Sequence, residues 1–225
     1  MTAALRISAS ILSADFTRLG EDIAAAERGG ADLIHIDVMD GRFVPEITIG
    51  AVIVEAVRSA TTLPVDVHLM IANPERHVER FARAGASSIT VHAEAATHLH
   101  RLVQQIKDLG VRAAVALNPG SPPVLLEPVL GELDMALLMT VNPGYAGQRF
   151  ISSVIPKIRQ LRAWISERAP AADLQVDGGI SEATAPQVVG AGANVLVAAS
   201  AIFKGRDGVE ASLRRLRQAA HVARA

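Results

Sequence analysis

The sequence predicts an α/β protein folded as one (β/α)8 barrel, or TIM barrel, across residues 1–225. Two observations predict this fold. Short apolar runs alternate eight times with amphipathic helical segments, and several of those segments end in a glycine that introduces the next run. Eight regular units in 225 residues favour a closed barrel over the rival open, doubly wound sheet. No stretch resembles a linker, so we expect a single domain.

The expected strands are short and bounded by turn residues. In order they are Leu5–Leu12, Leu33–Asp40, Val65–Met70, Ser88–Glu94, Arg112–Asn118, Met135–Val141, Leu174–Ile180 and Val195–Phe203. Amphipathic helices are expected between them, for example Pro74–Ala84, His98–Leu109 and Val154–Arg168. Because the carboxyl ends of barrel strands form the active face, any chemistry should sit at those strand ends.

The composition narrows the class of protein. Half of the residues are hydrophobic but only 3% are aromatic, which suits buried parallel strands of Ala, Val, Leu and Ile. The formal net charge of -1 does not indicate a surface that binds nucleic acid. The absence of cysteine excludes thiolate metal ligands and cysteine nucleophiles. Residues 1–16 make a poor signal peptide, and no apolar run reaches the ~18 residues of a membrane span. We therefore expect a cytoplasmic protein with no nucleic-acid or membrane partner.

Two histidines and two aspartates fall at expected strand ends. They are His35, Asp37, His68 and Asp177. Each one alone is more often a core histidine or a turn aspartate. Four together, at the ends of three strands facing one barrel mouth, would be costly unless paired or bound to metal. Imidazole with carboxylate is a normal ligand set for Zn, Fe, Mn or Co, so the sequence predicts one divalent metal cation there.

The two aspartates also predict a reaction. Asp37 and Asp177 belong to strands two and seven, so they approach the barrel axis from different sides. Two carboxylates that flank one carbon can remove a proton from one face and return it to the other. This is epimerisation beside a ketone, and a divalent metal would stabilise the enediolate as a Lewis acid. Metal ligation should leave the two aspartates with different proton affinities.

Three of the five methionines, Met39, Met70 and Met139, lie at the ends of expected strands two, three and six. A methionine is usually a core filler, and that interpretation is strong for each one alone. Together on one face, they suggest an apolar lining that excludes water from the reacting carbon.

A glycine-rich backbone is expected on the other side of the mouth. Its residues are Gly144, Tyr145, Ala146 and Gly147 in the sixth loop, Gly178 and Gly179 in the seventh, and Ala199 and Ser200 after the eighth strand. Barrels often bind phosphate with the loops after strands seven and eight, through backbone N–H groups. Walker and dinucleotide fingerprints are absent. A phosphorylated substrate is therefore expected without a nucleotide cofactor.

Several motifs in this order resemble the ribulose-phosphate 3-epimerase family over nearly the whole chain. They are SASILSADF, HIDVMDGRFVP, DVHLM, VHAE, LLMTVNPGYAGQ, VDGGI and VAASAIF. The resemblance implies a barrel isomerase of carbohydrate metabolism, in the pentose phosphate pathway, that interconverts D-ribulose 5-phosphate and D-xylulose 5-phosphate with a divalent metal. It also implies a homo-oligomer.

The resemblance assigns roles to residues. It implies metal ligation by His35, Asp37, His68 and Asp177, with Asp37 as proton acceptor and Asp177 as proton donor. Substrate contacts are implied for Ser10, His68, Gly144, Tyr145, Ala146, Gly147, Asp177, Gly178, Gly179, Ala199 and Ser200.

The sequence departs from the family's usual pattern at Ala9, Glu46, Ala146 and Ala199. Ala146 and Ala199 replace glycines in the expected phosphate-binding backbone. If either position needs a positive φ, alanine costs ~1 kcal/mol there.

Three alternatives remain open from the sequence. A sibling epimerase acting on allulose 6-phosphate would share the metal, the acids and the phosphate loops. A barrel decarboxylase would carry a lysine at the end of strand two, where this chain has His-Ile-Asp-Val-Met-Asp. A non-catalytic binding protein would not need the complete acid/base and metal set.

Overall fold

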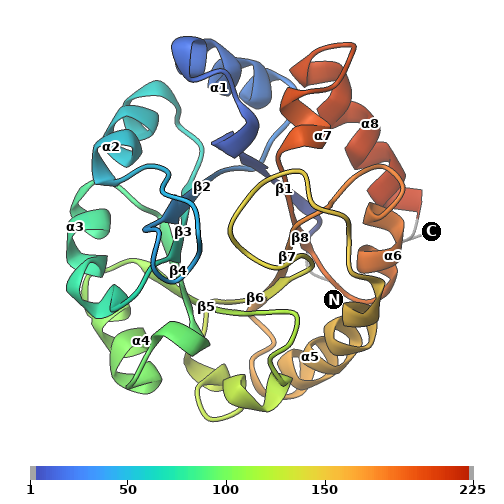
Figure 1. Cartoon of the computed structure of the whole chain (residues 1–225). Helices are drawn as coiled ribbons and strands as arrows, with labels where there is room; N and C mark the ends of the chain where they lie inside the picture. The colour runs from blue at the N-terminus through green and yellow to red at the C-terminus, as the bar shows by residue number, and fades with distance from the viewer. Residues whose placement is uncertain (1–3, 223–225) are drawn as a thin grey trace.

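The computed structural model, which describes residues 4–222, is a closed barrel of eight parallel strands in chain order (Figure 1). The strands are β1 Arg6–Ser10, β2 Leu33–Met39, β3 Val65–Met70, β4 Ser88–His92, β5 Arg112–Leu117, β6 Met135–Met139, β7 Asp173–Asp177 and β8 Val195–Ala198. The surrounding α-helices are α1 Leu19–Arg28, α2 Ala51–Ala60, α3 Val78–Arg83, α4 Leu99–Asp108, α5 Ile155–Arg168, α6 Ala185–Gly190, α7 Ser200–Phe203 and α8 Val209–Val222. The predicted fold class is confirmed.

Glycine ends four of the helical segments as predicted. Gly30, Gly85, Gly110 and Gly192 all have positive φ, between 74° and 112°. A side chain is strained in this left-handed conformation, which turns the chain back toward the next strand. The helices then pack their apolar faces on the outside of the barrel, as Leu102, Val103 and Ile106 of α4 do.

The structure differs from the sequence expectation in three connections. The eighth strand stops at Ala198, because Ala199 leaves the extended conformation (φ -112°, ψ -83°) and the chain enters α7. The first strand stops at Ser10, whose side chain caps a 3-10 helix over Ile11–Ser13. Between β5 and β6 the described chain forms only two short 3-10 helices. Prolines in this segment remove backbone donors and break a longer helix.

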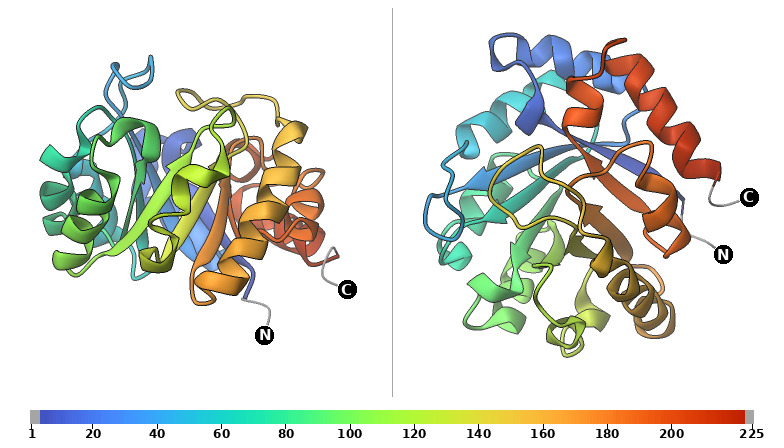
Figure 2. Two further views of the ribbon diagram at one scale, coloured as in Figure 1. Left: turned by 90° about the horizontal axis from the view of Figure 1, so that it is seen from below. Right: turned by 45° about the vertical axis from the view of Figure 1, so that its right-hand side comes forward.

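Strand register decides which residues meet inside the barrel. Asp37 pairs with His68 across β2 and β3, and His35 pairs with Asp66. Paired residues of parallel strands point to the same side of the sheet. The loops after β2 and β6 project from one end of the barrel, as Figure 2 shows from the side. That end carries the carboxyl ends of the strands.

The opposite end of the barrel is held by a polar cluster on β7. The carboxylate of Asp173 pairs with Arg6 of β1 and, at 2.7 Å, with Arg112 of β5. Asn194 donates to Asp173 at 2.8 Å and accepts from the backbone N–H of Leu174 at 2.8 Å. These contacts link three strands far from the carboxyl end. Within residues 4–222, no helix is long and apolar enough to cross a membrane.

Candidate active site

The four expected metal ligands come together at the mouth of the barrel. One ligand atom from each of His35, Asp37, His68 and Asp177 lies within 4.8 Å of the others. Oδ1 of Asp37 is 3.2 Å from both His35 Nε2 and His68 Nδ1. Oδ2 of Asp177 is 3.6 Å from His68 Nδ1 and 3.9 Å from His35 Nε2. The atoms therefore surround one point from three different strands.

The two carboxylates have opposite electrostatic environments. Burial opposes the charge on Asp37, but His35 and His68 outweigh it and hold the pKa of Asp37 well below its usual range. Burial and the charge of Asp37 raise the pKa of Asp177. The structure thus gives one carboxylate that stays ionised beside one that holds a proton more readily. This is the difference that a base and an acid in one site require.

The histidines carry the complementary shifts. Burial lowers the pKa of His35, but the carboxylates of Asp37 and Asp66 outweigh it and raise that pKa well above its ordinary value. For His68, burial acts the same way and is outweighed by Asp177 and Asp37, so its pKa is also raised. The negative charge of the aspartates therefore favours a positive charge on both imidazole rings. A divalent cation at this point would satisfy the same field.

The donor set fits a divalent cation. Two imidazoles and two carboxylates are a common set for transition metals, and three of the four residues are almost fully buried. The Nδ1 of His35 contacts Oδ2 of Asp66 at 2.8 Å. Asp66 in turn accepts hydrogen bonds of 2.7 Å from Ser88 and Gln175. This support leaves the Nε2 lone pair of His35 facing the cluster, as a metal ligand requires.

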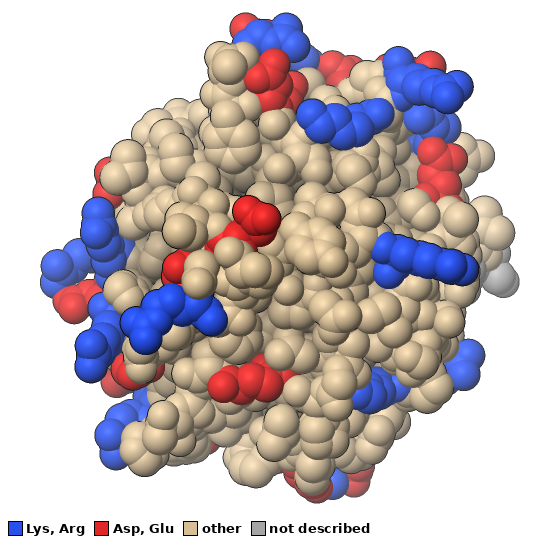
Figure 3. All heavy atoms as spheres, viewed as in Figure 1, with Lys and Arg blue, Asp and Glu red and all other residues tan. Residues whose placement is uncertain are grey.

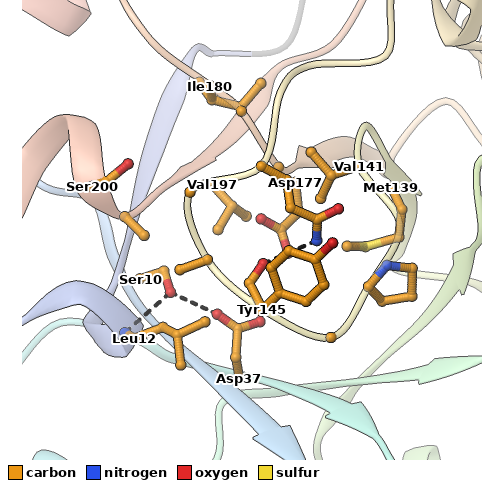
Figure 4. A pocket seen from close by; sticks show the side chains of 18 of the residues that line it. Ser10, Leu12, Asp37, Met139, Val141, Tyr145, Asp177, Ile180, Val197 and Ser200 are labelled. Atoms are coloured by element: carbon orange, nitrogen blue, oxygen red, sulfur yellow. Dashed lines mark hydrogen bonds between the residues drawn. The ribbon is translucent and has the colours of Figure 1, made fainter. Parts of the chain in front are cut away.

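A pocket includes both aspartates of the cluster, Asp37 and Asp177, in its lining (Figure 4). It is lined by Ser10, Leu12, Asp37, Met39, Met70, Met139, Val141, Pro143–Gln148, Asp177–Ile180, Val197, Ala199 and Ser200. The expected apolar lining and nearly all expected substrate contacts are in this set. His68 is the exception, because it is fully buried below the pocket and does not line it.

Hydrogen bonds hold the two aspartates in place. Ser10 donates to Oδ2 of Asp37 at 2.6 Å, and Thr48 donates to the backbone carbonyl of Asp37 at 2.7 Å. The side chain of Thr140 donates to the carbonyl of Asp177 at 2.9 Å and also contacts that of Gly178. Neighbours on other strands or loops therefore hold the Asp37 carboxylate and the backbone of both aspartates.

Glycines shape the far wall of the pocket. Gly144, Gly147, Gly178 and Gly179 all have positive φ. In the described residues the only other residue type with positive φ is Asn73, so Ala146 carries no such strain. Ala199 has a φ of -112°. The two alanines that depart from the family pattern thus cost no left-handed backbone strain.

Among residues 4–222, no lysine or arginine lines the pocket. Figure 3 shows the same face with its Lys and Arg side chains lying away from its centre. The glycine loops line the pocket together with Tyr145, Gln148 and Ser200, so the donors available to an anionic group belong to uncharged residues. The backbone phosphate site expected from the sequence stays a prediction.

Sequence reasoning missed the residues that support the site. Asp66 and Gln175 lie deeper on the strands that carry His68 and Asp177, and Thr140 follows β6. A signal existed for the first two, because residues two positions before a site residue share its face. Their roles depend on contacts across the barrel, which no local pattern reveals.

Comparisons with known proteins agree with this geometry. The profile described as the Ribulose-phosphate 3 epimerase family matches residues 6–203. The chain is 55% identical over 204 residues to "Ribulose-phosphate 3-epimerase" of Bacillus subtilis, covering 90% of this chain and 94% of that protein. It is 52% identical to "Ribulose-5-phosphate-3-epimerase, chloroplastic" of Arabidopsis thaliana, covering 91% and 74% of the two chains.

Among solved structures, KGPDC from Streptococcus mutans superposes with a TM-score of 0.72 at 15% identity, covering 98% of this chain and 99% of that one. At this identity the likeness shows the barrel fold alone. The family profile and the curated relatives go further, and with them the chain belongs to the ribulose-phosphate 3-epimerase family and is an epimerase, an enzyme of the isomerase class.

Proposed function

We propose that this epimerase interconverts D-ribulose 5-phosphate and D-xylulose 5-phosphate by proton transfer at C3. One observation carries the proposal: Asp37 and Asp177 line the same pocket with pKa values shifted in opposite directions. The names of the Bacillus subtilis and Arabidopsis thaliana relatives support the choice of substrate. The same proposal includes one barrel domain over residues 1–225, a homo-oligomer, and a cytoplasmic place in the pentose phosphate pathway.

The two aspartates perform the transfer. The ionised Asp37 accepts the C3 proton from one face of the ketose, which leaves an enediolate. Asp177 donates a proton to the opposite face, and the reverse reaction exchanges the two roles. Ser10 holds Oδ2 of Asp37 through its 2.6 Å hydrogen bond and so limits how that carboxylate turns. Met39, Met70 and Met139 line the pocket and keep water from the reacting carbon.

The enzyme is further proposed to be metal-dependent. His35, Asp37, His68 and Asp177 would hold one divalent cation, and Zn, Fe, Mn and Co all suit these donors. When bound, the cation supplies Lewis-acid stabilisation of negative charge on the substrate oxygens. The glycine loops and Ser200 would bind the phosphate, because they line the pocket opposite the acid/base pair.

Deuterium exchange at C3 tests the transfer directly. In deuterated water the wild-type enzyme should convert D-ribulose 5-phosphate into D-xylulose 5-phosphate that carries deuterium at C3, because Asp177 has exchanged its proton with the solvent before it donates. Asp37→Asn and Asp177→Asn should each lose about 10²–10⁴-fold in turnover or more, because each removes a proton-transfer group and a metal ligand. Glu55→Gln on the exposed face of α2 is the matched carboxylate control and should turn over normally.

Two results would contradict the proposal. Turnover without deuterium incorporation would exclude the enediolate route. Turnover of D-allulose 6-phosphate in a parallel assay, with none of the pentulose, would replace the substrate with the hexulose. Circular dichroism and bound-metal content of each variant separate loss of chemistry from loss of fold or metal.

A further inference from the structure

The imidazole ring of His68 also contacts His92, a histidine that has no role in the proposed mechanism. The Nδ1 of His68 faces Asp37 and Asp177, and its Nε2 points away and lies 2.9 Å from Nε2 of His92. Nδ1 of His92 is then 3.2 Å from Oε2 of Glu94. His92 ends β4, and Glu94 lies in the following 3-10 helix, Ala93–Ala95. Neither residue lines the pocket.

The environment of His92 isolates this contact from water. His92 is fully buried, and its ring stacks on that of His68 with centroids 5.0 Å apart. The ring of Phe43 covers it at 4.8 Å. The neighbouring position on β5 is Ala116, which offers no side-chain donor or acceptor. Within the part of the chain that the structure describes, the ring nitrogens of His92 therefore contact only His68 on one side and Glu94 on the other.

Glu94 decides the direction of the hydrogen bonds. Its Oε1 accepts from the backbone N–H of Asn118 at 2.8 Å and also from the Ser121 hydroxyl. Burial opposes ionisation of Glu94, but its hydrogen bonds, that from His92 first, lower the pKa to about 2. An ionised carboxylate only accepts hydrogen bonds. The proton on a neutral His92 must therefore lie on Nδ1, facing Glu94.

This assignment fixes the proton on His68 in turn. With its proton on Nδ1, His92 has only a lone pair at Nε2 and accepts from Nε2–H of His68. A neutral His68 with a proton on Nε2 has a bare lone pair on Nδ1, which is the atom that faces the metal-ligand cluster. In the opposite arrangement, His92 would turn a lone pair toward the Glu94 carboxylate, and His68 would present N–H to the metal.

We propose that Glu94 and His92 form a hydrogen-bonded relay that sets the tautomer of His68, and thereby the metal affinity of the site, without touching metal or substrate. The proposal rests on the metal site of the proposed function. It makes His92 and Glu94 positioning residues. The two histidine ligands then use opposite ring nitrogens: His35 offers Nε2 because Asp66 holds its Nδ1, and His68 offers Nδ1 because His92 holds its Nε2.

Zinc affinity of the metal-free chain, measured by competition with a chromogenic chelator without substrate, tests the relay. His92→Phe keeps a buried ring but removes the acceptor, and should weaken zinc binding by about 10–100-fold. His92→Gln keeps an acceptor oxygen and should recover most of that loss. His100→Phe breaks a matched histidine–glutamate contact, 2.9 Å to Glu132, on the exposed surface, and should leave zinc affinity unchanged.

A second measurement covers the case in which His92→Phe does not fold. Glu94→Gln removes the charge that orients His92 and should also weaken zinc binding. In the zinc-loaded wild type, ¹⁵N NMR of the histidine rings should show His68 protonated on Nε2 with zinc on Nδ1. Zinc on Nε2 of His68, wild-type affinity in folded His92→Phe or Glu94→Gln, or a wild type that binds no divalent metal would overturn the relay. Failure of the C3 exchange assay with these affinities as expected would contradict only the proposed function.

Discussion

Replacing Gly178 by alanine tests how tightly the backbone beside Asp177 is packed. Gly178 has a φ of 113°, and a Cβ added there would lie 2.3 Å from Cγ2 and 2.9 Å from Cγ1 of Val141. Carbon atoms that are not bonded to each other do not approach so closely, so the loop or Val141 must move. The left-handed backbone costs alanine about 1–2 kcal/mol, and overpacking adds about 1–3 kcal/mol. We expect the free energy of unfolding to fall by about 2–5 kcal/mol in total.

Gly147→Ala is the matched control. Its φ of 78° is also positive, so alanine is strained there too, but a Cβ there would have no atom within 4 Å. Gly178→Ala should therefore be the more destabilised variant, by at least the overpacking of about 1–3 kcal/mol. Urea unfolding followed by circular dichroism measures both, provided that the denaturant dependence stays constant. Adding Val141→Ala to Gly178→Ala should give a double variant less destabilised than the sum of its single changes.

The outcome is decisive in either direction. Equal destabilisation of Gly178→Ala and Gly147→Ala, or strict additivity with Val141→Ala, would refute the packing argument. Gly178→Ala should also lower turnover more than Gly147→Ala lowers it, because the displaced backbone carries Asp177.

Three further outcomes follow from contacts in the structure. Asn194→Ala should lower the free energy of unfolding by about 1–3 kcal/mol, since it strands the buried N–H of Leu174; a urea midpoint like that of the wild type would contradict this. Ser10→Ala removes a hydrogen bond to a charged acceptor worth about 1.5–3 kcal/mol, so kcat/KM should fall by about 10–100-fold, and an unchanged value would show that Asp37 needs no such partner. The raised pKa values of the two cluster histidines mean that a metal must displace their protons, so zinc affinity should weaken from pH 8 to pH 6; a pH-independent affinity would refute proton displacement.

The fold was predictable because local signals agreed with one another. Alternating apolar runs and helix-ending glycines such as Gly85 and Gly192 marked each unit without any knowledge of tertiary contacts. The errors occurred where the chain turns at the mouth. Ala199 reads as a strand residue in sequence, yet it leaves the extended conformation because α7 begins directly after it. Local propensity does not report that change.

The sequence predicted the residues that face the metal cluster and the pocket, but not the residues behind them that hold them in place. His35 and Asp37 share a face by the period of a strand, and so do Asp66 and His68. The period tells which face a residue occupies but not which residue lies opposite. The contact from His68 to His92 depends on the stagger of β4 against β3, which only the closed barrel fixes.

The lack of lysine and arginine in the pocket has a consequence for mutational scanning. Main-chain N–H groups stay in place when a side chain is substituted, unless the new side chain shifts the backbone, as is expected for Gly178→Ala. An alanine scan of the loop at Gly144–Gly147 would therefore record backbone strain and report little about the ligand. Amide-to-ester replacement, which deletes a single N–H, would be the informative chemistry. In the proposed phosphate site, alanine at positions 146 and 199 would keep the backbone N–H groups that are expected to bind the anion.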